Sequence, residues 1–196
     1  MRRPEKARRQ EALARAISDD PFVTDRELAR KLGVSVQTVR LDRLELGIPE
    51  ARERIRRLAR DAYSKVKAIE TGELVGELIS LKLGEEGMSI LDTTPEMSFK
   101  RTRIVRGHHI FAQANSLAVA VIDAKVALTG SATIRFKRPV YAGDRLVARA
   151  RVVSKDNGKY GVHVVTSVAK TEVFSGDFVV FDVMRDISPE GKEGPE

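Results

Sequence analysis

One stretch near the middle of the chain constrains the fold more than any other, residues 111–122 (FAQANSLAVAVI). Nine of its twelve side chains are apolar, and only Gln113, Asn115 and Ser116 are polar. A helix of this composition has no polar face to present to water, so it cannot lie on a surface. The stretch is also too short to cross a bilayer. We therefore expect a buried helix over about 107–123, enclosed by other parts of the chain.

The N-terminal end of this helix indicates what kind of site it forms. Arg106 and Gly107 stand where backbone N–H groups lack partners and attract anions. A catalytic site there needs a carboxylate or a histidine, but no carboxylate lies between Gly107 and Ile122. His108 and His109 point about 100° apart, so at most one of them faces a pocket. The pattern favours a site that holds a ligand without transforming it, and we assign no catalytic residue.

The positive charge of the chain is concentrated in its first third. Residues 1–70 carry 18 basic and 12 acidic side chains, whereas residues 71–196 carry 17 and 16. A basic segment beside a nearly neutral one favours nucleic-acid contact through the basic part. The chain has no cysteine, which excludes disulfides and thiolate metal sites, and we expect no metal. It shows no signal-peptide pattern or membrane span, so we expect a cytoplasmic protein without membrane contact.

Residues 1–48 have the pattern of a helix-turn-helix. A first helix is expected over 5–18, and a second over about 25–32, opened by the capping box Thr24-Asp-Arg-Glu27. Gly33 occupies the position that a tight turn between helices requires. These signals, next to a basic third helix, predict binding of double-stranded DNA.

The third helix is the expected recognition helix. It should run over about 36–46 after the N-cap Ser35, with Val36, Val39 and Leu44 as its apolar residues. Gln can read adenine, Arg can read guanine or hold phosphate, and Leu can touch a thymine methyl group. The residues expected to face outward are Gln37, Thr38, Arg40, Leu41 and Arg43.

Residues 49–70 form the expected linker, with one amphipathic helix over 50–69. Five arginines lie mostly off its apolar stripe. Such a charge run is usually a solvated face, but beside a DNA-reading unit it favours contact with phosphates or the minor groove. The stripe consists of Ile55, Leu58, Ala59, Ala62, Val66 and Ile69, and the arginines are Arg52, Arg54, Arg56, Arg57 and Arg60.

Residues 71–188 are expected to form an antiparallel sheet around the buried helix, followed by a disordered tail over 189–196. Strands are predicted over 73–83, 125–137, 144–155, 159–171 and 173–184, with a short apolar element over 88–91. One buried helix followed by long strands is the order of the hotdog fold, and RPVYAGDRLVARARV (138–152) resembles hotdog proteins at that point. The class is α+β. Hotdog domains usually pair, and most bind acyl-thioesters.

Two segments carry a more specific resemblance, RGHHIFAQANSLAVAVID (106–123) and VSVQTVRLDRLELGIPE (34–50). They resemble the FapR family, repressors of fatty-acid and phospholipid biosynthesis in Gram-positive bacteria, and the likeness extends over about 22–181. That family combines a DeoR-type helix-turn-helix, a linker helix and a dimeric hotdog domain. Its members are not enzymes, and malonyl-CoA or malonyl-acyl-carrier protein releases them from operator DNA.

The resemblance implies a role for individual residues. Arg106 would pair with the malonyl carboxylate, Gly107 would let the thioester approach backbone N–H groups, Phe99 would form an apolar wall, and Asn115 would hydrogen-bond near the ligand. On the DNA side it points to the recognition helix and to Arg52 in the minor groove. Ala51 stands where the family usually has Leu. The expected DNA-binding set is Ser35, Gln37, Thr38, Arg40, Arg43 and Arg52.

We therefore expect a homodimeric repressor that binds an inverted repeat in operator DNA and is released by malonyl-CoA, with no cofactor besides this effector. One alternative is a hotdog acyl-CoA thioesterase that carries an accessory helix-turn-helix. Turnover that depends on His108 or His109 would favour it. Another is a regulator that senses a different acyl-CoA.

Overall fold

The computed structural model describes residues 3–69 and 72–183, in two compact units, Met1–Arg60 and Asp61–Glu196. The expected boundary between linker and hotdog domain, at 70 and 71, and the expected disordered tail over 189–196 lie outside the described residues. Each unit is described by itself.

The first unit contains the three helices of the predicted helix-turn-helix, α1 (Arg3–Asp19), α2 (Asp25–Leu32) and α3 (Val36–Glu45). The capping box is present, with the Glu27 amide donating to the Thr24 hydroxyl and the Thr24 amide donating to the Glu27 carboxylate. Gly33 ends α2 in the left-handed region at φ 63°, as the turn requires. The core of the unit is a cluster of Leu13, Ile17, Val23, Leu28, Ala29 and Val39.

The linker helix is shorter than predicted. It forms α4 (Ala51–Tyr63), because its last turn tightens into bonds from the Lys65 amide to the Ala62 carbonyl and from the Val66 amide to the Tyr63 carbonyl. Val66 and Ile69, expected on its apolar stripe, follow the helix instead and pack against the core of the second unit. The apolar pattern thus continues past the point where the helix ends.

The second unit is a six-stranded antiparallel sheet with the order β1-β2-β4-β5-β6-β3. β1 and β3 are its edges, because each pairs with a single neighbour. A 3-10 turn, Pro95–Met97, precedes the helix α5 (Gly107–Ala120). The strands are β1 (Glu77–Lys82), β2 (Glu86–Asp92), β3 (Ala127–Phe136), β4 (Arg145–Asp156), β5 (Lys159–Val168) and β6 (Thr171–Asp182).

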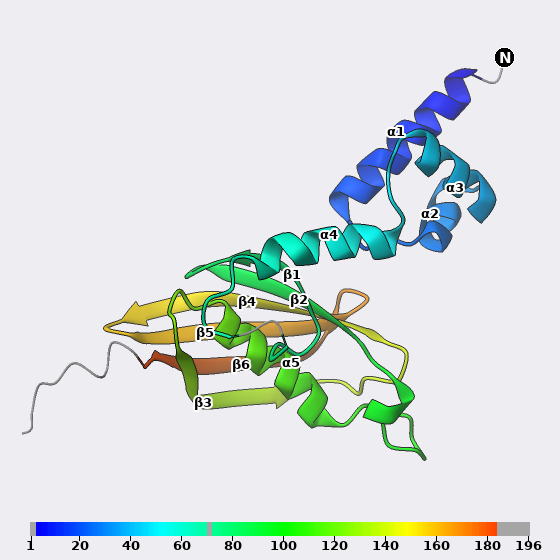
Figure 1. Cartoon of the computed structure of the whole chain (residues 1–196). Coiled ribbons are helices and arrows are strands. Elements are labelled where there is room, and N and C mark those ends of the chain that lie inside the picture. Colours follow the sequence, from blue (N-terminus) through cyan, green and yellow to red (C-terminus); the bar gives the residue numbers. More distant parts are fainter. Residues whose placement is uncertain (1–2, 70–71, 184–196) are drawn as a thin grey trace, which may run out of the picture. The chain divides into compact units, whose positions relative to one another are not determined.

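Figure 1 shows α5 against one face of this sheet, and buried side chains from both form the core. Alternate residues of the central strands turn inward, for example Leu146, Ala148 and Ala150 of β4. The antiparallel sheet around one buried helix confirms the predicted hotdog fold and the α+β class.

One row of paired residues shows how α5 crosses the sheet. Ser89, Ala148, Thr166, Phe174 and Phe136 are successive partners across five neighbouring strands. Gly107, the first residue of α5, lies against Phe136 at one end of the row, and Gln113 bonds to Ser89 at the other end. The first two turns of α5 therefore pass over this row.

Candidate functional site

The exposed side of α3 is the first candidate site. Val39, Asp42 and Arg43 are its buried residues, so Gln37, Leu41 and Leu44 lie on the opposite side. Leu41 is 55% exposed, and Leu44, expected among the apolar residues that pack inward, is 67% exposed.

Arg43 corrects one of our expectations, because it does not face outward. It is 7% exposed and donates from Nε and Nη2 to both carboxylate oxygens of Asp25, at 3.1 and 3.2 Å. Its Nη1 donates to the Ile48 carbonyl at 2.8 Å. The residue joins α2, α3 and the following loop, so we remove it from the DNA-binding set.

Of the other residues predicted on α3, two cap the start of the helix and two are exposed. The Ser35 hydroxyl accepts from the Thr38 amide at 3.0 Å and contacts the Thr38 hydroxyl at 2.9 Å, so both side chains serve the helix start. Gln37 is exposed. Arg40 is exposed as well, with its Nε 3.7 Å from the Asp25 carboxylate.

Arg54 is a second buried arginine, contrary to the exposed position expected for it on α4. Its guanidinium donates to three backbone carbonyls, those of Pro21 at 3.1 Å, Val23 at 2.6 Å and Pro49 at 2.6 Å. Burial, and the charge of Arg43 nearby, lower its pKa, but the group stays charged at neutral pH. Arg52, in contrast, is exposed as predicted.

The hairpin before α5 brings two of the predicted effector residues onto one face. Ser98 and Val105 pair across it and are buried, so the alternation of the strand turns Phe99 and Arg106 to the other face. Phe99 is 57% exposed. Arg106 is the N-cap of α5, and its guanidinium donates to the carbonyls of Glu96 and Met97. Among the described residues, Nη1 of Arg106 has no partner.

Close packing favours a glycine at position 107, which the sequence did not indicate. A Cβ atom there would lie 2.9 Å from Cζ and 3.1 Å from Cε1 of Phe136. The ring of Phe136 therefore covers the side of the helix start that we expected a thioester to approach. That ring is 52% exposed, and the start of α5 has no side-chain cap among the described residues.

Asn115 is set apart from the other predicted effector residues. It lies eight residues after Gly107, about 12 Å along the helix axis, and its Oδ1 accepts from the Thr129 hydroxyl of β3 at 2.8 Å. It is half-buried, whereas Gln113 of the same helix is fully buried. Gln113 Nε2 donates to the Ser89 carbonyl and hydroxyl, both at 3.3 Å.

The two histidines at the start of α5 differ in exposure. His108 is exposed, whereas Nε2 of His109 is buried and has no partner within the described part of the chain. Burial, followed by the charges of His108 and Arg106, lowers the pKa of His109. His109 is therefore neutral at pH 7. The described residues of α5 include no carboxylate that could pair with it.

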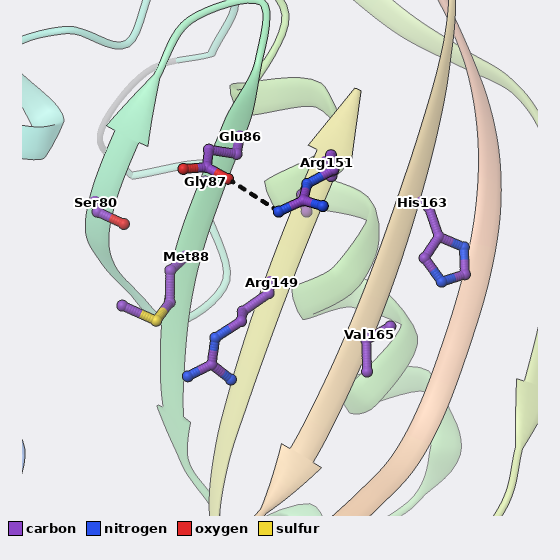
Figure 2. Close-up of a pocket in the computed structure, with 9 residues that line it drawn as sticks. Ser80, Glu86, Gly87, Met88, Arg149, Arg151, His163 and Val165 are labelled. Carbon is purple, nitrogen blue, oxygen red and sulfur yellow. Dashed lines mark ion pairs between the residues drawn. The ribbon is translucent and has the colours of Figure 1, made fainter. Parts of the chain in front are cut away.

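Figure 2 shows a hollow on the sheet face away from α5, which sequence reasoning missed. Glu86 and Arg151 form an ion pair of 3.6 Å beside it, and His163 Nδ1 lies 2.6 Å from an Asp177 carboxylate oxygen. These residues alternate with core residues on their strands, and apolar periodicity does not mark such a face. None of the predicted effector residues lines this hollow.

The described residues lack the features of two other classes of site, a membrane span and a metal centre. No helix over 3–69 or 72–183 has the length and apolar content to cross a bilayer. Within the same ranges, no cluster of three or more His, Cys, Asp or Glu side chains suits a metal ion.

Comparison with known proteins identifies the family. Residues 94–174 match the MaoC-like domain. A relative named transcription factor FapR from Caldanaerobacter subterraneus subsp. tengcongensis is 52% identical over 184 residues, 94% of this chain and 92% of the relative. FapR of Bacillus subtilis is 52% identical over 182 residues, 91% of this chain and 97% of that one.

A solved structure agrees with the fold of the second unit. It is a sigma28-regulated virulence protein from Campylobacter jejuni, which is 27% identical over 65% of this chain and 89% of its own, with a TM-score of 0.55. The FapR relatives cover both units and are named as transcription factors, not as enzymes. The chain therefore belongs to the FapR family of transcription factors.

Proposed function

We propose that this transcription factor is a repressor of fatty-acid and phospholipid synthesis genes, and that malonyl-CoA or malonyl-acyl-carrier protein releases it from operator DNA. The observation that carries the proposal is Arg106 at the start of a buried helix without carboxylates, in a chain that also holds a helix-turn-helix. A ligand with a free carboxylate fits an arginine, and a site without an acid–base pair holds it unchanged.

Arg106 supports discrimination among acyl groups. Its guanidinium is fixed by two backbone carbonyls, which leaves further donors for an incoming carboxylate. Acetyl-CoA lacks that carboxylate and would desolvate the cation without pairing it. Phe99, on the same face of the hairpin, supplies apolar surface beside it. The ring of Phe136 must move if a thioester is to reach the N–H groups of Gly107 and His108.

We also propose that the repressor is a homodimer on an inverted repeat. β3 is an edge strand, and it exposes Leu128 at 60% and Phe136 at 52%. Unpaired backbone groups and large apolar side chains on one edge favour pairing with a second copy. A two-fold axis through such a pair matches two half-sites related by the same symmetry. Gln37 and Arg40 would contact bases or phosphates there, and Arg52 the minor groove.

The test is an operator gel shift with the full chain, with and without malonyl-CoA, beside calorimetry with malonyl-CoA and acetyl-CoA. Arg106→Gln should bind operator as the wild type does but resist release, because its neutral amide cannot form an ion pair with the carboxylate. Arg101→Gln is the matched control, an exposed arginine of the same hairpin. Equal stabilisation by the two acyl-CoA molecules would contradict the role of Arg106.

A further inference from the structure

The outward side of α3 carries two large apolar side chains, Leu41 and Leu44, beside the polar Gln37. Gln37, Leu41 and Leu44 follow one another at spacings of four and three residues, so they form a single line. Leu41 and Leu44 are more than half exposed. Exposure of the two leucines to water is unfavourable, so this line favours binding to a surface that has apolar groups of its own.

The charges around this line favour a negatively charged partner. Both acidic residues of α3 are paired with α1, Asp42 with Arg9 at 2.6 Å and Glu45 with Lys6 at 2.6 Å. Asp42 is also buried. Arg40 is exposed on the flank of the line, with 58% of its side chain accessible. The helix thus presents an apolar centre beside a cation.

The major groove of DNA matches this surface. It admits an α-helix, its rims are phosphates, and the only methyl group that it displays is the C5-methyl of thymine. Leu41 and Leu44 lie about 4.5 Å apart along the helix axis, close to the step between neighbouring base pairs of about 3.4 Å. Two leucines in this arrangement can each meet a methyl group on adjacent steps.

We propose that Leu41 and Leu44 contact the methyl groups of thymines at two neighbouring base pairs of each operator half-site, and so help to determine its sequence. This inference rests on the DNA binding proposed above and adds to it a particular kind of base readout. Leu46, the C-cap of α3, is also exposed but lies on the other side of the helix, so it takes no part.

The experiment uses the full-length protein and deoxyuridine, which pairs like thymidine but lacks the methyl group. Duplexes are first selected from a random pool by the wild type, and each thymine is then replaced in turn. We expect two adjacent positions per half-site at which the replacement weakens binding about fourfold, the effect of one buried methyl group.

Variants assign each position to a side chain. Leu41→Ala and Leu44→Ala should each bind the thymine duplex more weakly and lose sensitivity to deoxyuridine at one position. Leu46→Ala is the matched control and should keep the full penalty at both positions. Circular dichroism of each variant checks that α3 still forms.

Three results would overturn the inference. One is a wild type that tolerates deoxyuridine everywhere, and another is an alanine variant that keeps the full deoxyuridine penalty at every position. The third is a Leu44→Ala variant that sediments at half the mass of the wild type, because Leu44 would then contact a second copy of the chain. Failure to select any sequence would instead contradict the proposed DNA binding itself, and the inference with it.

Discussion

The two units of the chain are stabilised by different kinds of contact. In the described residues, the core cluster of the first unit has six buried apolar side chains, whereas that of the second has 27. The first unit also buries three charged residues, Asp42, Arg43 and Arg54, and each of them has hydrogen-bond partners. The second unit buries Oε1 of Gln113 and Oγ1 of Thr166 without a partner among the described residues.

The difference follows from size. A domain of about 60 residues buries only a small apolar surface, so its stability from hydrophobic burial is marginal. Strong hydrogen bonds from charged side chains at its loops therefore supply a larger share of its stability. The larger unit buries much more apolar surface, so it tolerates buried polar atoms that lack a hydrogen-bond partner in the described part of the chain. We therefore expect the first unit to be sensitive to loss of single charges, and the second to loss of apolar volume.

The largest expected effect is that of Arg54→Met. Three backbone carbonyls, one of them fully buried, lose a charged donor, which costs about 3–5 kcal/mol in total. That is comparable to the whole stability expected for a unit of this size. Hydrogen exchange of the full chain should show α1 to α3 unfolding while the sheet stays protected. Arg56→Met, at an exposed position of the same helix, should change little.

Leu117→Ala tests the other side of the comparison. Leu117 is fully buried in α5, and its truncation should destabilise the sheet unit by about 2–5 kcal/mol. Urea unfolding followed by hydrogen exchange should place the loss in the second unit alone. An equal loss of protection in α1 to α3 would show that the two units do not unfold independently.

Gly107→Ala tests how tightly the start of α5 packs in the second unit. The new methyl group meets the Phe136 ring, but that ring is half exposed and can move, so we expect a cost of about 1 kcal/mol. In a Phe136→Leu background the same change should be neutral or stabilising, because alanine favours the helix. Thermal unfolding of the four proteins gives the coupling, and simple additivity would refute the contact.

The smallest effect is a dependence on pH. Hydrogen bonds from Arg9 lower the pKa of Asp42, and those from Thr24 lower the pKa of Glu27. A depressed pKa adds stability above the usual carboxyl value, about 4, and that stability is lost as pH falls through the folded-state pKa. The first unit should therefore weaken first below about pH 4.

Two asparagine variants isolate the pH effect. Asp42→Asn should lower the stability of the first unit at pH 7 and flatten its decline in acid. Asp123→Asn serves as the control, because Lys67 also lowers the pKa of Asp123 but the pair is exposed and screened by water. A decline that is unchanged in Asp42→Asn would show that other groups cause it.

Features encoded by neighbouring residues could be predicted from the sequence. The capping box, the turn at Gly33 and the burial of α5 each depend on a few adjacent side chains, and all three are present. The hairpin that brings Phe99 and Arg106 to one face was not predicted, because it rests on the bridge between Ser98 and Val105, which no local pattern marks. The strands were recognised by composition, although β1 begins four residues later than expected.

Features that depend on distant residues could not be predicted. Arg54 is buried because Pro21 and Val23, more than 30 residues earlier, offer it carbonyl oxygens. On α3, apolar residues occur on both sides, so periodicity did not show that Leu44 faces outward and Arg43 inward. Gln113 is buried rather than Asn115 because β2 supplies Ser89 beneath it.

The mixed outward face of α3 has a consequence for how the protein searches a genome. In the proposed complex, contacts of Arg40 with phosphate would release counterions, so they would weaken as salt rises, on every sequence alike. Contacts between leucine and methyl groups release no ions. Added salt should therefore reduce residence on random DNA while the advantage of thymine over deoxyuridine stays constant. The two leucines beside one arginine would let selectivity persist across changes in the ionic strength of the cell.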